Sequence, residues 1–243
     1  MIRILALLVA LLLSQAALAG DRPVVVELFT SQGCPNCPPA QTMLSEIAER
    51  DNILVLSWPV DYWDFMGWKD TFARPENARR QESYNRALRQ PGVYTPQIVV
   101  DGTFEVVGSR RESVRSRIAE ARAVQRQDVS LALNEDDGFC VVEMPDAGSV
   151  HEGPVHIEAI YFRAEDKVSI SAGDNRGRMM QYRNVVLMTR DLGIWSDSNR
   201  TLRIPVRDAM DAGADHMAIL LHLGMREGPI VGAASMPLHP PGL

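Results

Sequence analysis

The sequence predicts two domains of different class: an α/β domain over residues 20–127 and an all-β, sandwich-like domain over residues 128–243. Apolar runs of strand length alternate with helical patterns up to residue 127. Beyond that point the helical patterns stop, and short alternating stretches follow one another between Gly, Pro and Asp turns. A series of about seven or eight such strands is typical of a β-sandwich.

Residues 1–19 have the three parts of a secretory signal peptide. Arg3 precedes an unbroken apolar run over Ile4–Leu13, and Ala17-Leu18-Ala19 forms a small-residue cleavage site before Gly20. No later stretch approaches the roughly 20 apolar residues that a membrane-spanning helix needs. We therefore expect a periplasmic or secreted protein whose mature chain has no membrane span.

The composition is acidic, with 25 Lys and Arg against 31 Asp and Glu and a formal net charge of −6. The chain has no block of basic residues, so we expect no nucleic acid partner. It also lacks a phosphate-binding glycine-rich loop, a dinucleotide fingerprint and a Gly-x-Ser-x-Gly elbow. These absences argue against nucleotide-dependent enzymes and serine hydrolases.

The predicted order of elements in the first domain is β-α-β-α-β-β-α. Pro23–Thr30 is apolar and β-branched enough for a strand buried on both faces. From Pro38 onward the apolar residues take the spacing of one helix face. The remaining elements are a strand over 52–58, a helix over 75–90, strands over 97–100 and 103–107 joined at Asp101-Gly102, and a helix starting at a capping box over 109–112.

The second domain is expected to contain extended segments only. The stretch Gly173–Arg178 is predicted to be a turn between two of them. The predicted strands cover residues 128–134, 139–144, 155–163, 168–172, 179–191, 201–207, 215–223 and 230–238.

Two cysteines, Cys34 and Cys37, lie at the junction of the first strand and the first helix. The unpaired amides at a helix start favour the thiolate, which is the form that attacks disulfides. Cys37, one turn further on, is close enough to attack a mixed disulfide formed at Cys34. We therefore predict a redox pair with Cys34 as nucleophile and Cys37 as resolving thiol.

The dipeptide Thr95-Pro96 precedes the strand that begins at Gln97. In the predicted order this strand runs antiparallel to the first, so Pro96 is expected to abut the cysteine pair. A proline there, especially in the cis form, leaves the backbone of Thr95 free to pair with an extended substrate.

Glu27 is the sole charged residue of the first strand. A buried carboxylate with a raised pKa could take the proton from Cys37. Alternatively, Glu27 faces a polar neighbour or the edge of the sheet.

Three aromatic residues, Tyr62, Trp63 and Trp68, follow the second strand, on the same side as the cysteine pair. They could form a wall that binds a partner protein. The alternatives are a loop that packs on its own core, or an interface with the β-domain.

These features together resemble the thioredoxin superfamily: a strand, Cys-x-x-Cys at a helix start, and Thr-Pro before a hairpin. The stretches ELFTSQGCPNCPPA, PVDYWDFMGWKD, VYTPQIVVDG and RNVVLMTRDLGIW are similar to a family of secreted bacterial thioredoxin-like proteins of unknown function. The resemblance implies a thioredoxin-like fold for the N-terminal domain, with Cys34 and Cys37 as redox pair and Pro96 as cis-proline. Gln32-Gly33 departs from thioredoxins, which usually have an aromatic residue before the first Cys.

The predicted function is that of an exported thiol-disulfide oxidoreductase with no cofactor beyond the Cys34–Cys37 disulfide. Its expected partners are a protein thiol or disulfide substrate and a redox partner protein. The alternative is a two-domain binding protein whose pair holds copper or zinc, or closes a structural loop. A disulfide that closes so short a loop adds little stability, and a zinc or copper ion would need further ligands beside the two cysteines. The third cysteine, Cys140, lies in an apolar run and is expected to be a buried, inert strand residue.

Overall fold

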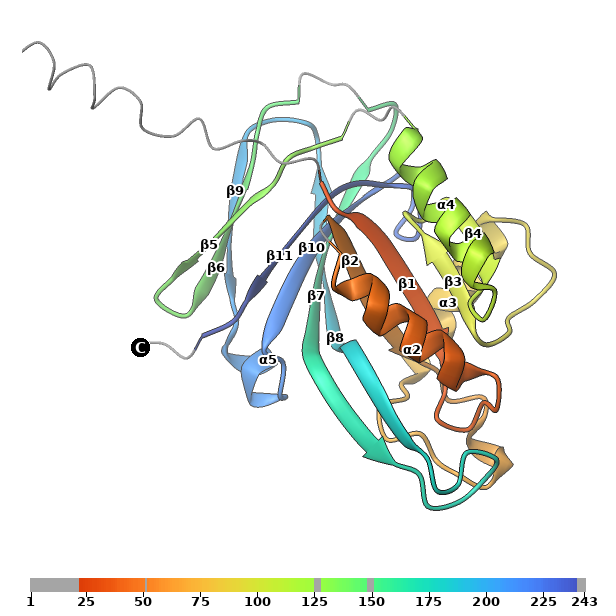
Figure 1. Ribbon diagram of the computed structural model, residues 1–243. Helices are drawn as coiled ribbons and strands as arrows, with labels where there is room; N and C mark the ends of the chain where they lie inside the picture. The colour runs from red at the N-terminus through yellow and green to blue at the C-terminus, as the bar shows by residue number, and fades with distance from the viewer. Residues whose placement is uncertain (1–21, 51, 125–127, 148–150, 240–243) are drawn as a thin grey trace, which may run out of the picture.

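The structure is a computed structural model that describes residues 22–50, 52–124, 128–147 and 151–239 (Figure 1). The predicted signal peptide lies outside these residues. The elements are β1 (Val24–Thr30), α2 (Cys37–Ala48), β2 (Ile53–Pro59), a 3-10 helix (Asp64–Met66), α3 (Pro75–Ala87), β3 (Gln97–Val100), β4 (Phe104–Val107), α4 (Arg111–Ala123), β5 (Ala132–Asp136), β6 (Phe139–Met144), β7 (Val155–Ser169), β8 (Met179–Trp195), β9 (Arg200–Pro205), α5 (Arg207–Asp211), β10 (His216–Leu223) and β11 (Ile230–Pro237). No helix within the described ranges is long and apolar enough to cross a membrane.

One mixed sheet of eight strands runs through the molecule in the order β11-β10-β7-β8-β2-β1-β3-β4. Strands β1 and β2 are parallel, and β3 runs antiparallel to β1, as the predicted order requires. A separate antiparallel sheet contains β5, β6 and β9. The α/β character of the first half is confirmed, and the second half is extended apart from the short helix α5.

The sandwich prediction needs one correction, because four strands of the second half extend the sheet of the first. β8 reaches β2 through a bridge between Ser57 and Val185. The Ser57 hydroxyl donates to the carbonyl of Arg183 at 2.8 Å, and the Asn184 amide donates to the carbonyl of Val55 at 2.8 Å. Pairing between strands so far apart in the chain leaves no local signal, which is why the sequence did not reveal the shared sheet.

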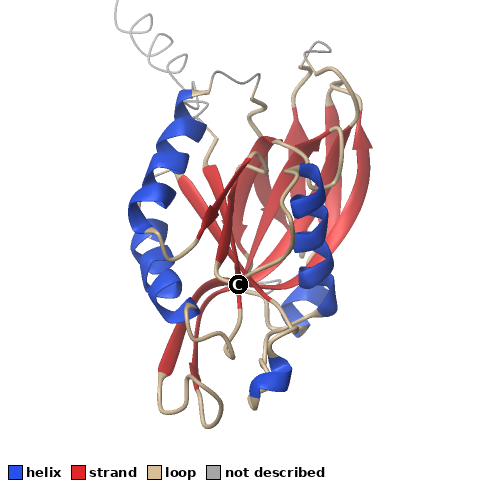
Figure 2. Ribbon diagram, turned by 90° about the vertical axis from the view of Figure 1, so that its right-hand side faces the viewer, coloured by secondary structure: helices blue, strands red, loops and turns tan. Residues whose placement is uncertain are grey.

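Helices cover both faces of the N-terminal part of this sheet, as Figure 2 shows. Val26 and Leu28 of β1 pack with the apolar face of α2 and with α4. Val25 and Phe29, which alternate with them, pack on the opposite face with Tyr84 of α3. Both faces of β1 are therefore buried, in agreement with its continuous apolar sequence.

The small sheet packs on the C-terminal part of the large one and completes a sandwich there. Its inward residues share a core with β7, β8, β10 and β11. Cys140 of β6 is in this core with 1% exposure, and its Sγ lies 3.6 Å from Sδ of Met236. The prediction of a buried strand cysteine is confirmed.

Several boundaries differ from the sequence prediction. The strand expected over 128–134 begins at Ala132, and the stretch 168–172 is not a separate strand, since β7 continues to Ser169. The N-cap of α4 is Arg110 without a side-chain hydrogen bond, so the predicted capping box is wrong. Helix α5 was not expected because five residues are too few for a periodic pattern.

Candidate active site around the Cys34–Cys37 disulfide

The two cysteines occupy the turn between β1 and α2 and form a disulfide with a Cα–Cα distance of 5.4 Å. Cys37 is the first residue of α2, and its backbone N–H donates to the carbonyl of Cys34 at 3.3 Å. Both cysteines are fully buried, at 0% exposure. The disulfide thus lies at a helix start, as predicted, but its two cysteines have no exposed surface, which the sequence did not predict.

The peptide bond between Thr95 and Pro96 is cis. It lies directly before β3, whose first residue, Gln97, pairs with Phe29 of β1. Pro96 therefore lies beyond the last pair of the ladder, at the end of β1 from which the chain continues to Cys34. The carbonyl of Pro96 accepts a hydrogen bond from the backbone N–H of Gly108 at 2.8 Å.

Glu27 lies on the other face of β1 from α2. It shares the face of Val25 and Phe29, and its side chain is fully buried against α3. Arg80 Nε donates to Glu27 Oε1 at 2.8 Å, and the Tyr84 hydroxyl donates to Glu27 Oε2 at 2.5 Å. The structure therefore brings this carboxylate to Arg80 and Tyr84 rather than to Cys37.

Arg80 also joins the N-terminal half to the β-half. Its NH1 donates to Glu158 Oε2 of β7 at 2.8 Å, and His222 Nε2 of β10 lies 3.5 Å from the same oxygen. Burial raises the pKa of Glu158, but the charge of Arg80 and the contact with His222 outweigh it and lower the pKa to about 2. Since Arg80 contacts the fully buried carboxylate of Glu27 and the partly buried one of Glu158, it links α3, β1 and β7.

The aromatic residues of the loop after β2 face inward. Tyr62 and Trp63 pack against the core beneath α3, and Trp68 packs against the core of the sandwich. The Tyr62 hydroxyl donates to Gln81 Oε1 at 3.1 Å, and burial raises the pKa of Tyr62 to about 12. The apolar side chain that this loop exposes most is Phe65, at 81% exposure.

Gln32 fixes that loop to the cysteine turn. Its Oε1 accepts a hydrogen bond from Trp68 Nε1 at 2.8 Å, and its Nε2 donates to the Thr71 hydroxyl at 3.0 Å. Its backbone N–H donates to Asp70 Oδ2 at 2.7 Å. Burial raises the pKa of Asp70 to about 6. From the sequence, Gln32 was only a departure from thioredoxins; its contacts show what replaces the usual aromatic residue.

Asn175, in the turn between β7 and β8, is a site residue that the sequence did not reveal. Its Nδ2 donates to the carbonyl of Cys34 at 2.8 Å and to that of Gln32 at 2.9 Å. Figure 1 shows the β7–β8 tip at the same end of the molecule as the turn before α2. An asparagine in a predicted turn normally needs no further explanation, so only the three-dimensional structure identifies it.

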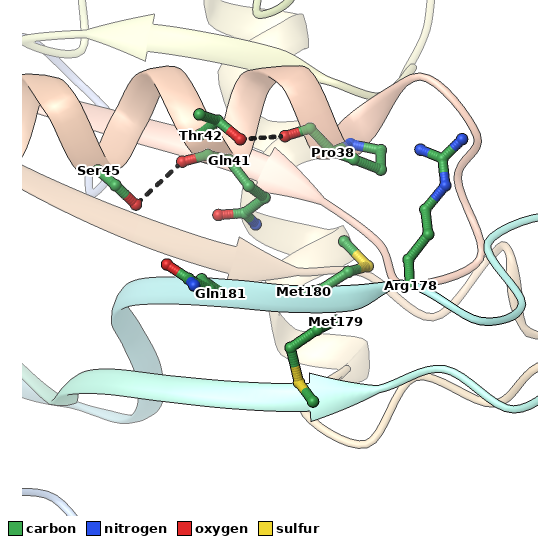
Figure 3. A pocket seen from close by; sticks show the side chains of 8 residues that line it. All are labelled: Pro38, Gln41, Thr42, Ser45, Arg178, Met179, Met180 and Gln181. Atoms are coloured by element: carbon green, nitrogen blue, oxygen red, sulfur yellow. Dashed lines mark hydrogen bonds between the residues drawn. The ribbon is translucent and has the colours of Figure 1, made fainter.

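A groove of about 520 Å³ opens between α2 and the start of β8. In Figure 3 Gln41 and Met180 point into it from the two sides, and Arg178 lies beside Pro38, the residue after Cys37. Its lining residues are Pro38, Gln41, Thr42, Ser45, Arg178, Met179, Met180 and Gln181. The groove therefore places an accessible surface next to the buried pair.

Within the described ranges, no three His, Cys, Asp or Glu side chains are grouped closely enough to hold a metal ion. The five histidines of the sequence all lie in the β-half, away from the cysteine turn in the chain.

Comparison with known proteins gives a family match and a fold match. The model of a family described as protein of unknown function, DUF1223, matches residues 25–222. A crystal structure of a protein from Agrobacterium tumefaciens is 31% identical, with a TM-score of 0.76, over 89% of this chain and 95% of that one. The structure of HBP35 of Porphyromonas gingivalis shares the fold at 15% identity, with a TM-score of 0.61, over 90% of this chain and 76% of its own.

A short match links the chain to thioredoxins. A protein of Archaeoglobus fulgidus named probable thioredoxin is 40% identical over 38 residues. These residues make up 16% of this chain and 42% of that protein. The likeness to a thioredoxin is thus local, whereas the family match covers most of the chain.

Proposed function

The chain belongs to the DUF1223 family of proteins of unknown function, so its activity has to be inferred from its own site residues. We propose that it is a thiol-disulfide oxidoreductase that uses Cys34 and Cys37. The observation that carries this proposal is the Cys34–Cys37 disulfide at the start of α2, at the end of the sheet where the cis Thr95–Pro96 bond also lies. The short match to a probable thioredoxin supports it.

The exchange proceeds in two thiol-disulfide steps. A substrate thiolate attacks Sγ of Cys34, which breaks the Cys34–Cys37 bond, forms a mixed disulfide and releases Cys37 as a thiolate. A second thiolate of the substrate then attacks the substrate sulfur that is bonded to Cys34 and releases Cys34 as a thiolate. The substrate becomes a disulfide, and the Cys34–Cys37 pair becomes a dithiol. The reverse sequence reduces a substrate disulfide. The positive end of α2 stabilises the thiolate of Cys34 in both directions.

The other predicted site residues have different roles in the proposed exchange. Thr95 offers its backbone to an extended substrate segment beside Pro96. The inward-facing Tyr62, Trp63 and Trp68 support the loop that exposes Phe65, and act on a substrate through that loop. Glu27 has a structural role, because both of its carboxylate oxygens accept hydrogen bonds on the face of β1 that lies away from α2.

We place this activity in the periplasm or outside the cell, with a protein thiol or disulfide as substrate and a second redox protein as partner. The N-terminal pattern of Arg3, apolar run and small residues supports this compartment. A disulfide persists in such an oxidising environment.

The test is catalysis of disulfide exchange by the purified mature chain. We expect it to speed either the reduction of insulin by a small dithiol or the oxidation of a reduced, unfolded model protein. Cys37→Ser should trap a mixed disulfide at Cys34, because the resolving thiol is missing. Cys140→Ser is the matched control and should keep full activity.

Two results would contradict the proposal. One is a rate, in both directions, no higher than that of a Cys34→Ser/Cys37→Ser double variant. The other is stoichiometric zinc or copper in anaerobically purified protein that the double variant loses, which would favour the metal-binding alternative.

A further inference from the structure

The tip of the β7–β8 hairpin, residues 170–178, contacts the disulfide turn through one buried polar side chain. Most side chains of the tip are exposed, including Asp174, Arg176 and Arg178. Asn175 between them is fully buried. An exposed turn is thus attached to the redox site by one polar side chain.

The carboxamide of Asn175 is matched to the cysteine turn. Its orientation follows from its partners, since the carbonyls of Gln32 and Cys34 are both acceptors and require the amide nitrogen. Both hydrogens of Nδ2 are therefore used. Its Oδ1 is buried and has no hydrogen-bond partner among the described residues. Burial of an unbonded polar oxygen is unfavourable, so the closed position of the tip depends on the two bonds of Nδ2.

A second contact of the tip is tight packing at Gly173. A Cβ added there would lie 3.1 Å from the carbonyl oxygen of Met66 and 3.2 Å from Cβ of Trp68. The backbone of Gly173 has φ +69°, a conformation that favours glycine. The tip therefore lies against the loop after β2 without room for a side chain.

An attacking thiolate must reach Sγ of Cys34, yet Cys34 and Cys37 are both at 0% exposure. Some neighbouring element must move before exchange. β1 and α2 belong to the core, and the loop after β2 is fixed by the bonds of Gln32 and Asp70. The hairpin tip differs from these elements, because most of its side chains are exposed and its side-chain hydrogen bonds to the cysteine turn come from Asn175.

We propose that the β7–β8 tip is a cover over the redox pair and that Asn175 is the latch that keeps it closed. This inference rests on the proposed function. Asn175 is a positioning residue: it takes no part in bond breaking, and it acts through the carbonyl of Cys34. Exchange occurs after Asn175 leaves that carbonyl, and the incoming thiolate then attacks Cys34 and displaces Cys37.

The test follows reduction of the oxidised mature protein by excess glutathione, which is itself oxidised to glutathione disulfide as the pair becomes a dithiol. Asn175→Ala should raise the rate at least about 10-fold, because two hydrogen bonds that hold the cover are lost. Arg176→Ala, on the same tip, makes no such bond and should stay within about twofold of wild type. The wild-type rate should level off at high glutathione as opening becomes limiting, while that of Asn175→Ala stays proportional.

Two further variants separate a latch from general loosening. Gly173→Ala disturbs the other contact of the tip and should also raise the rate. Gly102→Ala, at the opposite end of β3, would collide with the carbonyl of Gly228 and destabilises the fold without touching the tip. It should leave the glutathione rate unchanged under conditions where circular dichroism shows all variants folded.

The latch is overturned if Asn175→Ala is reduced at the wild-type rate, or if Gly102→Ala accelerates reduction as much as Asn175→Ala does. These outcomes are distinct from failure of the proposed function. If only the proposed function fails, glutathione still reduces the Cys34–Cys37 disulfide, and does so faster in Asn175→Ala than in wild type. Neither the wild type nor any variant would then exchange disulfides with a protein substrate.

Discussion

Arg80 Nε lies 2.8 Å from Glu27 Oε1, with both side chains at 5% exposure or less. The same guanidinium contacts Glu158 of β7, so one cation balances two carboxylates from the two halves of the chain. The stability of the junction therefore depends on a charge balance that a single substitution can upset.

Replacing Arg80 by Met should destabilise the protein strongly. The substitution keeps much of the apolar volume but leaves Glu27 and Glu158 without their counter-charge, at a cost of ~3 kcal/mol or more. Urea unfolding measures this loss. Arg79→Ala is the control, because Arg79 is exposed in the same helix and its loss should cost less than about 0.5 kcal/mol. Equal effects of the two substitutions would contradict the charge balance.

The ionisation of Glu158 should make stability depend on acid pH. Its pKa falls from 4.5 to about 2 in the folded protein, through Arg80 against the opposing effect of burial. A lowered carboxyl pKa adds stability that is complete above 4.5 and is lost as the pH falls toward 2, ~3 kcal/mol in all. The difference in unfolding free energy between wild type and Glu158→Gln should therefore shrink by more than half between pH 6 and about pH 3. A difference that is constant over this window would exclude the lowered pKa.

Gly102 and Gly92 form a matched pair of glycines. An added Cβ at Gly102 meets the backbone of Gly228, and φ is +64°, whereas nothing lies within 4 Å of a Cβ at Gly92. Gly102→Ala should lower the unfolding free energy by ~2 kcal/mol or more, and Gly92→Ala should change it by less than about 0.5 kcal/mol. Thermal unfolding of both variants checks this. If Gly102→Ala did not lower the unfolding free energy, the backbone at Gly228 would have to move away from the added Cβ at little cost.

Gln32 should matter for stability although it lies beside the redox pair. Gln32→Ala removes the acceptor of Trp68 Nε1 and the donor to Thr71, which should cost ~2 kcal/mol in urea unfolding and change the tryptophan fluorescence. The exposed Gln181, which lines the groove beside α2, supplies the control. If Gln181→Ala were equally costly, the hydrogen bonds of Gln32 would not explain the loss.

Cys140 should be chemically silent in the folded protein. Burial raises its pKa to about 11, so almost no thiolate is present at neutral pH. The oxidised native protein should show no fast thiol with Ellman's reagent, one after unfolding, and three after unfolding and reduction. A fast-reacting thiol in the native oxidised protein would mean that Cys140 is accessible or that the pair is open.

Local patterns predicted the elements of the site well. The strand before Cys34 and the helix at Pro38 follow from periodicity and turn chemistry, and the cis bond before Pro96 was implied by the resemblance to thioredoxins. The face of Glu27 also follows from the alternation of a strand, which places it with Val25 and Phe29 and therefore away from α2. The prediction that Glu27 takes a proton from Cys37 did not apply this alternation.

Contacts between distant segments account for what could not be predicted. The bridge from Ser57 to Val185 merges the two halves into one sheet, and the amide of Asn175 reaches Cys34. Neither contact leaves a local pattern, because both depend on how strands from different parts of the chain are paired. The same is true of the salt bridges of Arg80.

The bond between Asn175 and Cys34 joins residues that are 141 positions apart. A ribosome makes the chain from its N-terminus, so the cysteines leave it long before the hairpin that contacts them exists. The contact can form only once the β7–β8 hairpin has been made and has paired with β2. A hydrogen bond at the cysteine turn therefore marks the point at which the two halves of the chain have come together.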